Sequence, residues 1–414
     1  MRGRSAVTDA GSRLWAPARL GPFRLLWLGQ SLSLLGDGFS YVAFSWITLS
    51  LTGSTLALGY VLALQAVPRA LLTLVGGSLA DKWSPRRIMV LSSWARTAVM
   101  ASVGLTGLTG TLSIGLLCVA AAAFGAVDAF FQPARMTVLP SVVEKDLLAP
   151  ANALLGTGSR IAAMVGPAVG GVVVAVSDAD VAFLVDALCF ALCGLCVLGV
   201  RTRGGYSPVR TLEPERMLVR IRAGLRYAWA DPRIRTILAI DAAVTFCYAG
   251  AFTVGFADLA RFELDGGPTT LGVLNGALAA GAVLGGLTGG LVDGRPRIGL
   301  LIAALAGWLA VGTAVLGVLH NTVAAVATVL AMGFAIGFQG VFGLSWIQRT
   351  IDESVLSRVL SLDMVLGYAV APVSLVLCGA LAQVHTALMF GGTAVILAVT
   401  ALGVLASPRV RASR

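Results

Sequence analysis

The sequence predicts an all-α membrane protein with twelve transmembrane helices in two pseudo-symmetric six-helix bundles. Of its 414 residues, 57% are hydrophobic and only 12% are charged, whereas about a quarter of the residues in soluble domains are charged. The mean hydropathy of +0.89 also indicates burial in lipid. The longest polar interval, near 201–235, is too short to enclose a core of its own. We therefore expect nearly the whole chain to lie in the membrane.

Apolar runs long enough to cross the hydrocarbon core, which takes about 20 residues, occur repeatedly along the chain. The interval 201–235 separates an amino-terminal bundle over 25–200 from a carboxy-terminal bundle over 236–406, with tails over 1–24 and 407–414. The runs lie near 25–50, 56–80, 88–108, 112–134, 153–176, 181–200, 236–258, 271–292, 298–319, 322–346, 359–381 and 386–406.

The basic residues are sorted by side of the membrane. With a cytoplasmic amino terminus, nearly all Arg and Lys fall in cytoplasmic segments, and Arg261 is the one in an outer loop. This sorting predicts a multi-pass protein of a bacterial inner membrane with both termini in the cytoplasm. The net charge of +10 is spread between apolar runs and does not indicate nucleic acid. The portion 215–229 predicts an amphipathic helix on the cytoplasmic face.

A short repeat supports the division into two halves. The sequence GGSLAD, from Gly76 to Asp81, follows the second apolar run, and GGLVD, from Gly289 to Asp293, follows the eighth. Equivalent positions in two six-span halves are what parallel repeats about an axis along the membrane normal require.

Asp37 is the principal candidate for proton coupling. It lies midway along the first span, where a charged group needs a partner, a water-filled cavity or a function. Burial penalises the charged form of a carboxyl group, so we expect Asp37 to exchange a proton as cargo binds; a structural, hydrogen-bonded Asp is the alternative. A polar stripe at helical spacing predicts that it faces a central cavity with Gln30, Ser33, Tyr41, Ser45 and Thr48.

Other ionisable residues inside the spans extend this set. In the seventh span, Asp241, Thr245 and Tyr248 share one face, and Asp241 is placed either at the ligand or at a gate. Arg69 and Arg96 are predicted to pair with Asp37 or Asp128, although either cation is also suited to an anionic cargo.

Gly77, Asp81, Arg86 and Arg87 lie between the second and third spans, in the order glycine, acid, bases. This stretch resembles the signature of the major facilitator superfamily, and the resemblance covers essentially the whole chain. It implies the major facilitator fold and alternating access between two bundles. We expect these four residues to form a conformational gate with Asp128 and Arg135 of the fourth span.

The fifth span contains Gly166, Pro167, Gly170 and Gly171. This stretch resembles the motif of the superfamily's proton-coupled exporters, which implies efflux; ordinary helix packing is the alternative. Proline bends a helix and glycine permits close contact, so we expect a flexible seam between the two halves. The stretches 28–37 and 131–154 resemble the branch that includes macrolide, tetracycline and enterobactin exporters.

The resemblance implies proton-coupled efflux of small amphipathic molecules, drugs or natural products. Export of a siderophore or another endogenous metabolite is the alternative, followed by proton-coupled import. Lys82 and Lys145 lack the glycine-rich phosphate loop of an ATP-driven pump. His320 and His385 are far apart in sequence and complete no catalytic set, so we expect no enzyme, cofactor or metal site. The expected partners are a small-molecule cargo, protons and lipid, with the protein monomeric.

Overall fold

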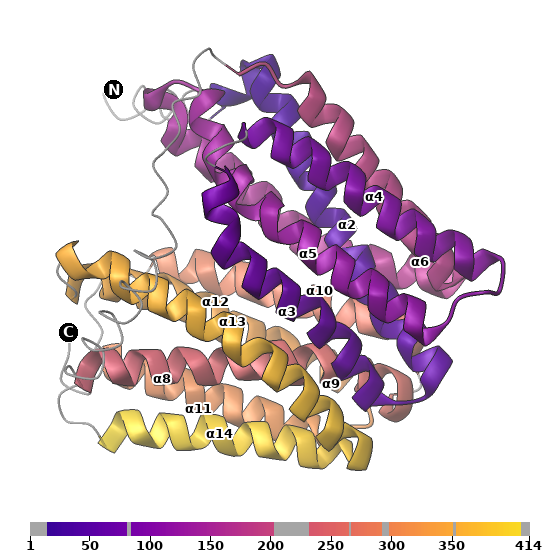
Figure 1. Ribbon diagram of the computed structural model, residues 1–414. Helices are drawn as coiled ribbons and strands as arrows, with labels where there is room; N and C mark the ends of the chain where they lie inside the picture. Colours follow the sequence, from indigo (N-terminus) through magenta and orange to yellow (C-terminus); the bar gives the residue numbers. More distant parts are fainter. Residues whose placement is uncertain are drawn as a thin grey trace, which may run out of the picture. The chain divides into compact units, whose positions relative to one another are not determined.

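The computed structural model describes residues 15–80, 84–202, 232–264, 266–291, 298–350 and 353–406, and over these residues it is almost entirely helical (Figure 1). The predicted amphipathic helix at 215–229, the tails over 1–14 and 407–414, and Asp81 lie outside the described residues. The long helices are α2 Gly21–Thr52, α3 Thr55–Ala80, α4 Pro85–Leu108, α5 Ile114–Val138, α6 Leu148–Gly199, α8 Pro232–Phe246, α10 Gly267–Leu291, α11 Ile298–Leu316, α12 Thr322–Thr350, α13 Glu353–Val384 and α14 Thr386–Ala406.

Eleven stretches of the described chain are long and apolar enough to span a membrane. One of them, Lys145–Gly199, has 55 residues, which is more than twice the length that one crossing needs. Its helix α6 is broken at Asp178, whose φ of 73° and ψ of 165° are not helical. The break divides α6 into a fifth and a sixth span, so the predicted architecture of twelve transmembrane helices is confirmed.

The seventh span is assembled from four short helical segments. After α8 come the π-helix η4 Cys247–Phe252, α9 Thr253–Asp258 and the π-helix η5 Leu259–Glu263. Such π-helical turns interrupt the regular hydrogen bonding of a helix and are frequent at functional sites. Sequence periodicity predicted one continuous helix here, because a π-turn inserts a residue without changing the apolar composition.

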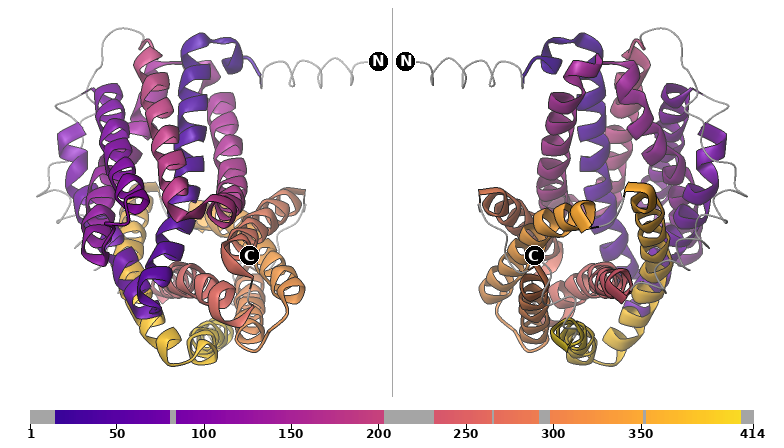
Figure 2. Two further views of the ribbon diagram at one scale, coloured as in Figure 1. Left: turned by 90° about the vertical axis from the view of Figure 1, so that its right-hand side faces the viewer. Right: turned by 90° about the vertical axis from the view of Figure 1, so that its left-hand side faces the viewer.

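The helices form two compact units. Unit 1 comprises Met1–Ala43 and Pro68–Leu212, and unit 2 comprises Phe44–Val67 and Glu213–Arg414. Unit 1 contains the larger part of α2 together with α4, α5 and α6. The axes of these helices are roughly aligned with one another (Figure 2). In unit 2, α11 packs against α14 and α10 packs against α12 (Figure 1). The end of α2, from Phe44 onward, and the first part of α3 belong to unit 2, although they precede most of unit 1 in sequence.

Glycines bring α10 and α12 into backbone contact. Methyl groups added to Gly281 and Gly285 of α10 would collide with the carbonyl oxygens of Leu330 and Phe334. In the opposite direction, a methyl group on Gly337 would lie 2.7 Å from the Ala282 Cα. Small residues four apart on both helices permit this approach, which provides the packing energy that a hydrophobic effect cannot supply in lipid.

A second close contact joins the outer ends of α3 and α13 within unit 2. A methyl group on Gly59 would lie 2.5 Å from the Leu375 carbonyl oxygen and 3.4 Å from the Gly379 Cα. The Thr55 hydroxyl donates to the Gly379 carbonyl at 3.0 Å, and the Ser54 hydroxyl donates to Gln383 Oε1 at 2.8 Å. Backbone proximity and side-chain hydrogen bonds together fix the register of these two helices.

We expect Gly337→Val to lower the free energy of unfolding by about 1–3 kcal/mol, the usual cost of overpacking, because its side chain would enter the α10 backbone. Thermal unfolding of the purified protein in lipid nanodiscs measures this. Gly340→Val is the matched control, since nothing lies within 4 Å of a methyl group at that position of the same helix. Equal destabilisation by both variants would show that helix propensity, and not the α10 contact, sets the cost.

Candidate functional site

Arg96 of α4 lies at the centre of a charge cluster inside unit 1. Its side chain is 0% exposed. The guanidinium lies 4.0 Å from the ring centroid of Phe131 on α5 and 4.3 Å from that of Phe190 on α6. Cations are attracted to the faces of aromatic rings, and this attraction is strongest where water is absent. The two rings therefore hold an arginine in the middle of the membrane-spanning region.

Asp128 is the carboxylate that this arginine neutralises. Its Oδ1 lies 3.3 Å from Arg96 Nη1, and its Oδ2 lies 3.1 Å from Arg69 Nε. The prediction that Arg69 and Arg96 act as ion-pair partners for the intramembrane acids agrees with these contacts. A buried charge is tolerated when it is paired. Arg96 donates a hydrogen bond to Oδ1 of Asp128, and Arg69 lies within ion-pair distance of Oδ2.

Asp37 is the acid of the cluster whose side chain is partly exposed, as is that of Arg69 among the cations. Its Oδ1 lies 3.8 Å from Arg96 Nη1, and its side chain is 31% exposed. Arg135, about two helical turns beyond Asp128 on α5, interacts electrostatically with both carboxylates. The structure thus brings Asp37, Arg69, Asp128 and Arg135 together around Arg96, with Asp37 at the accessible edge.

The rest of the predicted stripe on the first span is placed differently. Gln30 and Ser33 are buried, and neither the Gln30 Nε2 nor the Ser33 Oγ has a hydrogen-bond partner. The prediction that these two residues face an open cavity is therefore wrong in this structure. The reason is close packing: a methyl group on Gly29 would lie 3.1 Å from the Cys196 Cβ, so α6 covers this side of α2. Tyr41 is partly buried.

The basic residues of the loop signature contact a helix end. Arg86 Nε donates to the Val197 carbonyl at 3.2 Å, and its Nη2 donates to the Leu198 carbonyl. These carbonyls lie in the last turn of α6, where a cation complements the helix dipole; that of Val197 also accepts from the backbone N–H of Val200. Arg87 is exposed, and its backbone N–H donates to the Ser84 hydroxyl, which caps α4. Asp128 thus pairs with Arg69 and Arg96, and the expected pairing with Arg86 is absent among the described residues. The surroundings of Gly77 and Asp81 lie outside them.

The exporter-like motif of the fifth span packs on the first span. Gly166, Pro167, Gly170 and Gly171 are all buried. A methyl group on Gly166 would lie 3.3 Å from the Gly38 Cα, and one on Gly170 would lie 3.1 Å from the Phe39 Cα. The seam expected between the two halves is therefore found here within unit 1. It fixes the backbone directly after Asp37, which links the motif to the charge cluster.

The predicted residues of the seventh span lie in unit 2. Asp241 is exposed, and its carboxyl group lies close to that of Asp363 on α13. One turn further on, Thr245 approaches Gly367, and Tyr248 is 55% exposed. The Ser374 hydroxyl donates to the carbonyl of Phe246, the residue directly before the π-helix η4. Asp241, Thr245 and Tyr248 thus share one face, as predicted.

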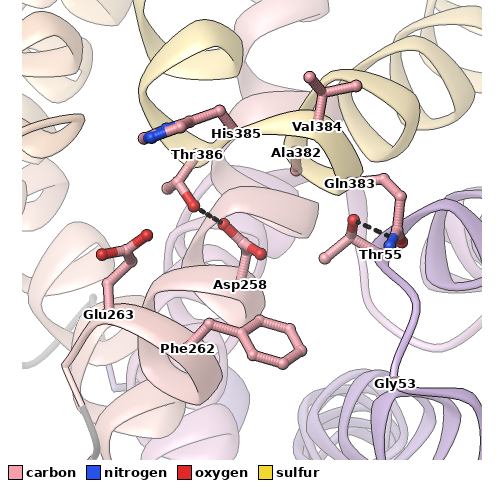
Figure 3. Close-up of a pocket in the computed structure, with 10 residues that line it drawn as sticks. All are labelled: Gly53, Thr55, Asp258, Phe262, Glu263, Ala382, Gln383, Val384, His385 and Thr386. Atoms are coloured by element: carbon pink, nitrogen blue, oxygen red, sulfur yellow. Dashed lines mark hydrogen bonds between the residues drawn. The ribbon is translucent and has the colours of Figure 1, made fainter.

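Sequence reasoning missed a polar pocket at the other end of the seventh span. Asp258 is buried and accepts a hydrogen bond of 2.6 Å from the Thr386 hydroxyl (Figure 3). Glu263 and His385 also line this pocket, which has a volume of about 270 Å³. Glu263 lies 3.3 Å from His320 Nδ1. Asp258 escaped notice because the predicted span ended at that residue, and the two His residues because they are far apart in sequence.

A family model described as transmembrane secretion effector, within the major facilitator superfamily, matches residues 12–413 of the chain. The chain belongs to this family. It is 29% identical over 375 residues to the multidrug efflux pump Tap of Mycolicibacterium fortuitum, covering 88% of this chain and 90% of that protein. It is 22% identical over 357 residues to macrolide efflux protein A of Streptococcus pyogenes, covering 86% of this chain and 88% of that protein.

The crystal structure of the nucleoside transporter NupG has the same fold as this protein. The TM-score is 0.71 at 13% sequence identity, covering 93% of this chain and 98% of that chain. This likeness confirms the predicted major facilitator fold. The protein is a multi-pass membrane transporter.

We expect Asp128→Ala to destabilise the protein by about 3–5 kcal/mol, because it leaves the buried Arg96 without its carboxylate. Most of this cost comes from Arg96, since its side chain is fully buried and its charge would lose its ion pair with Asp128. Thermal unfolding in lipid nanodiscs measures the loss. Asp146→Ala, which removes an exposed carboxylate, is the control and should change stability little. A stability of Asp128→Ala close to that of the control would rule out the charge cluster as a structural element.

Proposed function

We propose that this protein exports small amphipathic molecules, drugs or natural products, in exchange for protons. The observation that carries the proposal is the position of Asp37 at the accessible edge of a buried charge cluster. A carboxyl group that is 31% exposed and 3.8 Å from a fully buried arginine can exchange a proton with water, and its charge state acts on the pairing inside the cluster. Such a group meets two requirements of proton coupling: it has access to water, and its charge state affects the ion pairs of the cluster.

The direction and the cargo class follow from relatives and from the fifth span. Proteins named for multidrug efflux and for macrolide efflux match most of this chain. The glycine–proline motif supports the same direction through its resemblance to the motif of proton-coupled exporters, and it packs on the backbone directly after Asp37. We therefore assign efflux, with macrolide-like amphipathic molecules as the first cargo class to test.

The proposed cycle is alternating access between the two halves of the major facilitator fold. Protonation of Asp37 from the outside disfavours cargo, and release of the proton to the cytoplasm restores cargo binding. A proton shifts this equilibrium only through its different affinity for the two states, which the Arg96 contact provides. The sorting of basic residues supports a bacterial inner membrane as the location, with both termini cytoplasmic, and we propose a monomer as the working unit.

We expect Asp37→Asn to abolish the acceleration of transport by a pH gradient, because the amide cannot release a proton. The measurement is erythromycin transport by the full-length protein in proteoliposomes, with and without an imposed pH gradient. Asp146→Asn, at an exposed cytoplasmic position on the predicted orientation, is the control and should behave as the wild type. Undiminished gradient-driven transport by Asp37→Asn would remove this residue from the coupling mechanism. A wild-type protein that ignores the gradient would refute proton coupling itself.

A further inference from the structure

Asp186 is a buried acid of unit 1 that does not take part in the ion pairs around Asp37 and Asp128. It lies on the part of α6 that follows the break, and its side chain is 0% exposed. One carboxyl oxygen accepts a hydrogen bond from the Ser40 hydroxyl, and the other, Oδ1, has no partner. Among the described residues no basic side chain forms an ion pair with it. A carboxylate in this position is costly unless it is neutralised.

The first span is shaped to receive Asp186. A methyl group on Gly36 would collide with Asp186 Oδ1 and would lie 3.4 Å from the Phe190 ring. Ser40, one turn further along α2, provides the hydrogen bond to the other oxygen. Gly36 and Ser40 thus give room and a donor to the acid of α6, while Asp37, between them in sequence, faces the accessible edge of the cluster. Such a fitted surrounding distinguishes Asp186 from an acid that is merely tolerated.

Arg96 carries hydrogen-bond donors that nothing uses. Its Nε and Nη2 are buried without a partner, while its Nη1 reaches Asp128. Arg96 interacts electrostatically with Asp186, and it is stacked on Phe190, which lies one turn beyond Asp186 on α6. Free cationic donors and a free carboxyl oxygen therefore occupy the same buried cluster. Buried polar groups are normally hydrogen-bonded, so the donors of Arg96 and the oxygen of Asp186 are available for an interaction with each other.

The charges of the cluster explain why Asp186 lacks a cation in this state. Arg69 and Arg96 both contact Asp128, and Arg135 is shared between Asp37 and Asp128. The remaining titratable groups near Asp186 are the thiols of its own helix, of which Cys189 is the nearer. The ionisable groups that face Asp186 are Asp37 on α2, Arg96 on α4 and Cys189 on its own helix. Arg69 on α3 and Asp128 and Arg135 on α5 join the cluster through Asp37.

We propose that Asp186 binds the proton that is exchanged for cargo, and that Arg96 is the positioning residue that pairs with Asp186 when the proton leaves. The inference rests on the proposed function and deepens it. The proton departs from the Asp186 carboxyl to Asp37 and from there to water. The resulting carboxylate accepts hydrogen bonds from the free donors of Arg96, which weakens the contact between Arg96 and Asp128. Reprotonation returns Arg96 to Asp128.

The first experiment compares erythromycin transport in proteoliposomes at equal pH with transport driven by a pH gradient. Asp186→Asn mimics the protonated acid, so exchange at equal pH should persist while the acceleration by the gradient is lost. Ser40→Ala removes a hydrogen bond that stabilises the carboxylate, so the pH of half-maximal driven transport should rise. A purely structural role would lower rates without moving that pH. Unchanged gradient acceleration in Asp186→Asn overturns the proposal.

The second experiment needs no cargo. Infrared difference spectra of the purified protein in lipid, between about pH 5 and pH 9, avoid the range in which an exposed Asp titrates, near about 3.9. The wild type should show a protonated carboxyl band that disappears as the pH rises. Asp186→Asn should lack the component of this band that Asp186 contributes, while the other buried carboxyl groups keep theirs, and Asp146→Asn should retain the whole band. Identical spectra for the wild type and Asp186→Asn would show that Asp186 does not titrate.

A third variant guards against misfolding of Asp186→Asn. Gly36→Ala keeps every ionisable group but crowds Asp186 Oδ1, so it should shift the pH midpoint of driven transport. Gly156→Ala is its control, since nothing lies within 4 Å of a methyl group there. An unshifted midpoint in Gly36→Ala counts against the proposal. If transport by the wild type does not respond to a pH gradient, both the proposed function and the role of Asp186 are refuted. If the wild type and Asp186→Asn respond equally, only the role of Asp186 is refuted.

Discussion

A charge inside a membrane-spanning bundle must be neutralised, and this requirement organises unit 1. Arg96 is fully buried, and the elements around it are arranged to satisfy it: Phe131 on α5 and Phe190 on α6 supply ring faces, and Asp128 supplies the counter-charge. The same residues set how the helices can move, because a shift of α4 against α5 or α6 would separate a buried charge from its partners. A helix shift is therefore low in free energy only where Arg96 finds another carboxyl group as a partner. Asp37 and Asp186 are the carboxyl groups available for this.

Close helix contact is what makes this arrangement possible. Without Gly36 and Gly38, α2 could not lie against Asp186 and the fifth span, and the acid of α6 would be displaced from Ser40. Unit 2 uses the same device between α10 and α12, where glycines on both helices bring the backbones together. In lipid, small residues provide the close packing that large apolar side chains provide in a soluble core. The composition of the chain, with 50 glycines, reflects this requirement.

The sequence was sufficient to predict the spans and the main charged residues, but not their pairing. Hydropathy identifies a span because the bilayer imposes a length, and an Asp or Arg inside a span is conspicuous. Periodicity places Asp37 on a polar stripe, yet Gln30 and Ser33 of that stripe are buried, since only packing decides which helix covers a face. Asp186 lies within the sixth apolar run, but periodicity assigns it no partner, because its contacts with Gly36 and Ser40 join residues that are far apart in the chain.

The carboxyl groups within the spans have different surroundings in the two units. In unit 1, three acids and three arginines share a cluster, so a proton on one acid changes the partner of a cation. In unit 2, α11 and α14 contribute no charged residue between 298 and 316 or between 386 and 406, and Asp241 and Asp363 lie close to each other. Among the described residues, no arginine forms an ion pair with either of these two acids. Within the described part of the chain, it is therefore the buried arginine of unit 1 that can convert a change of protonation into a change of helix contacts.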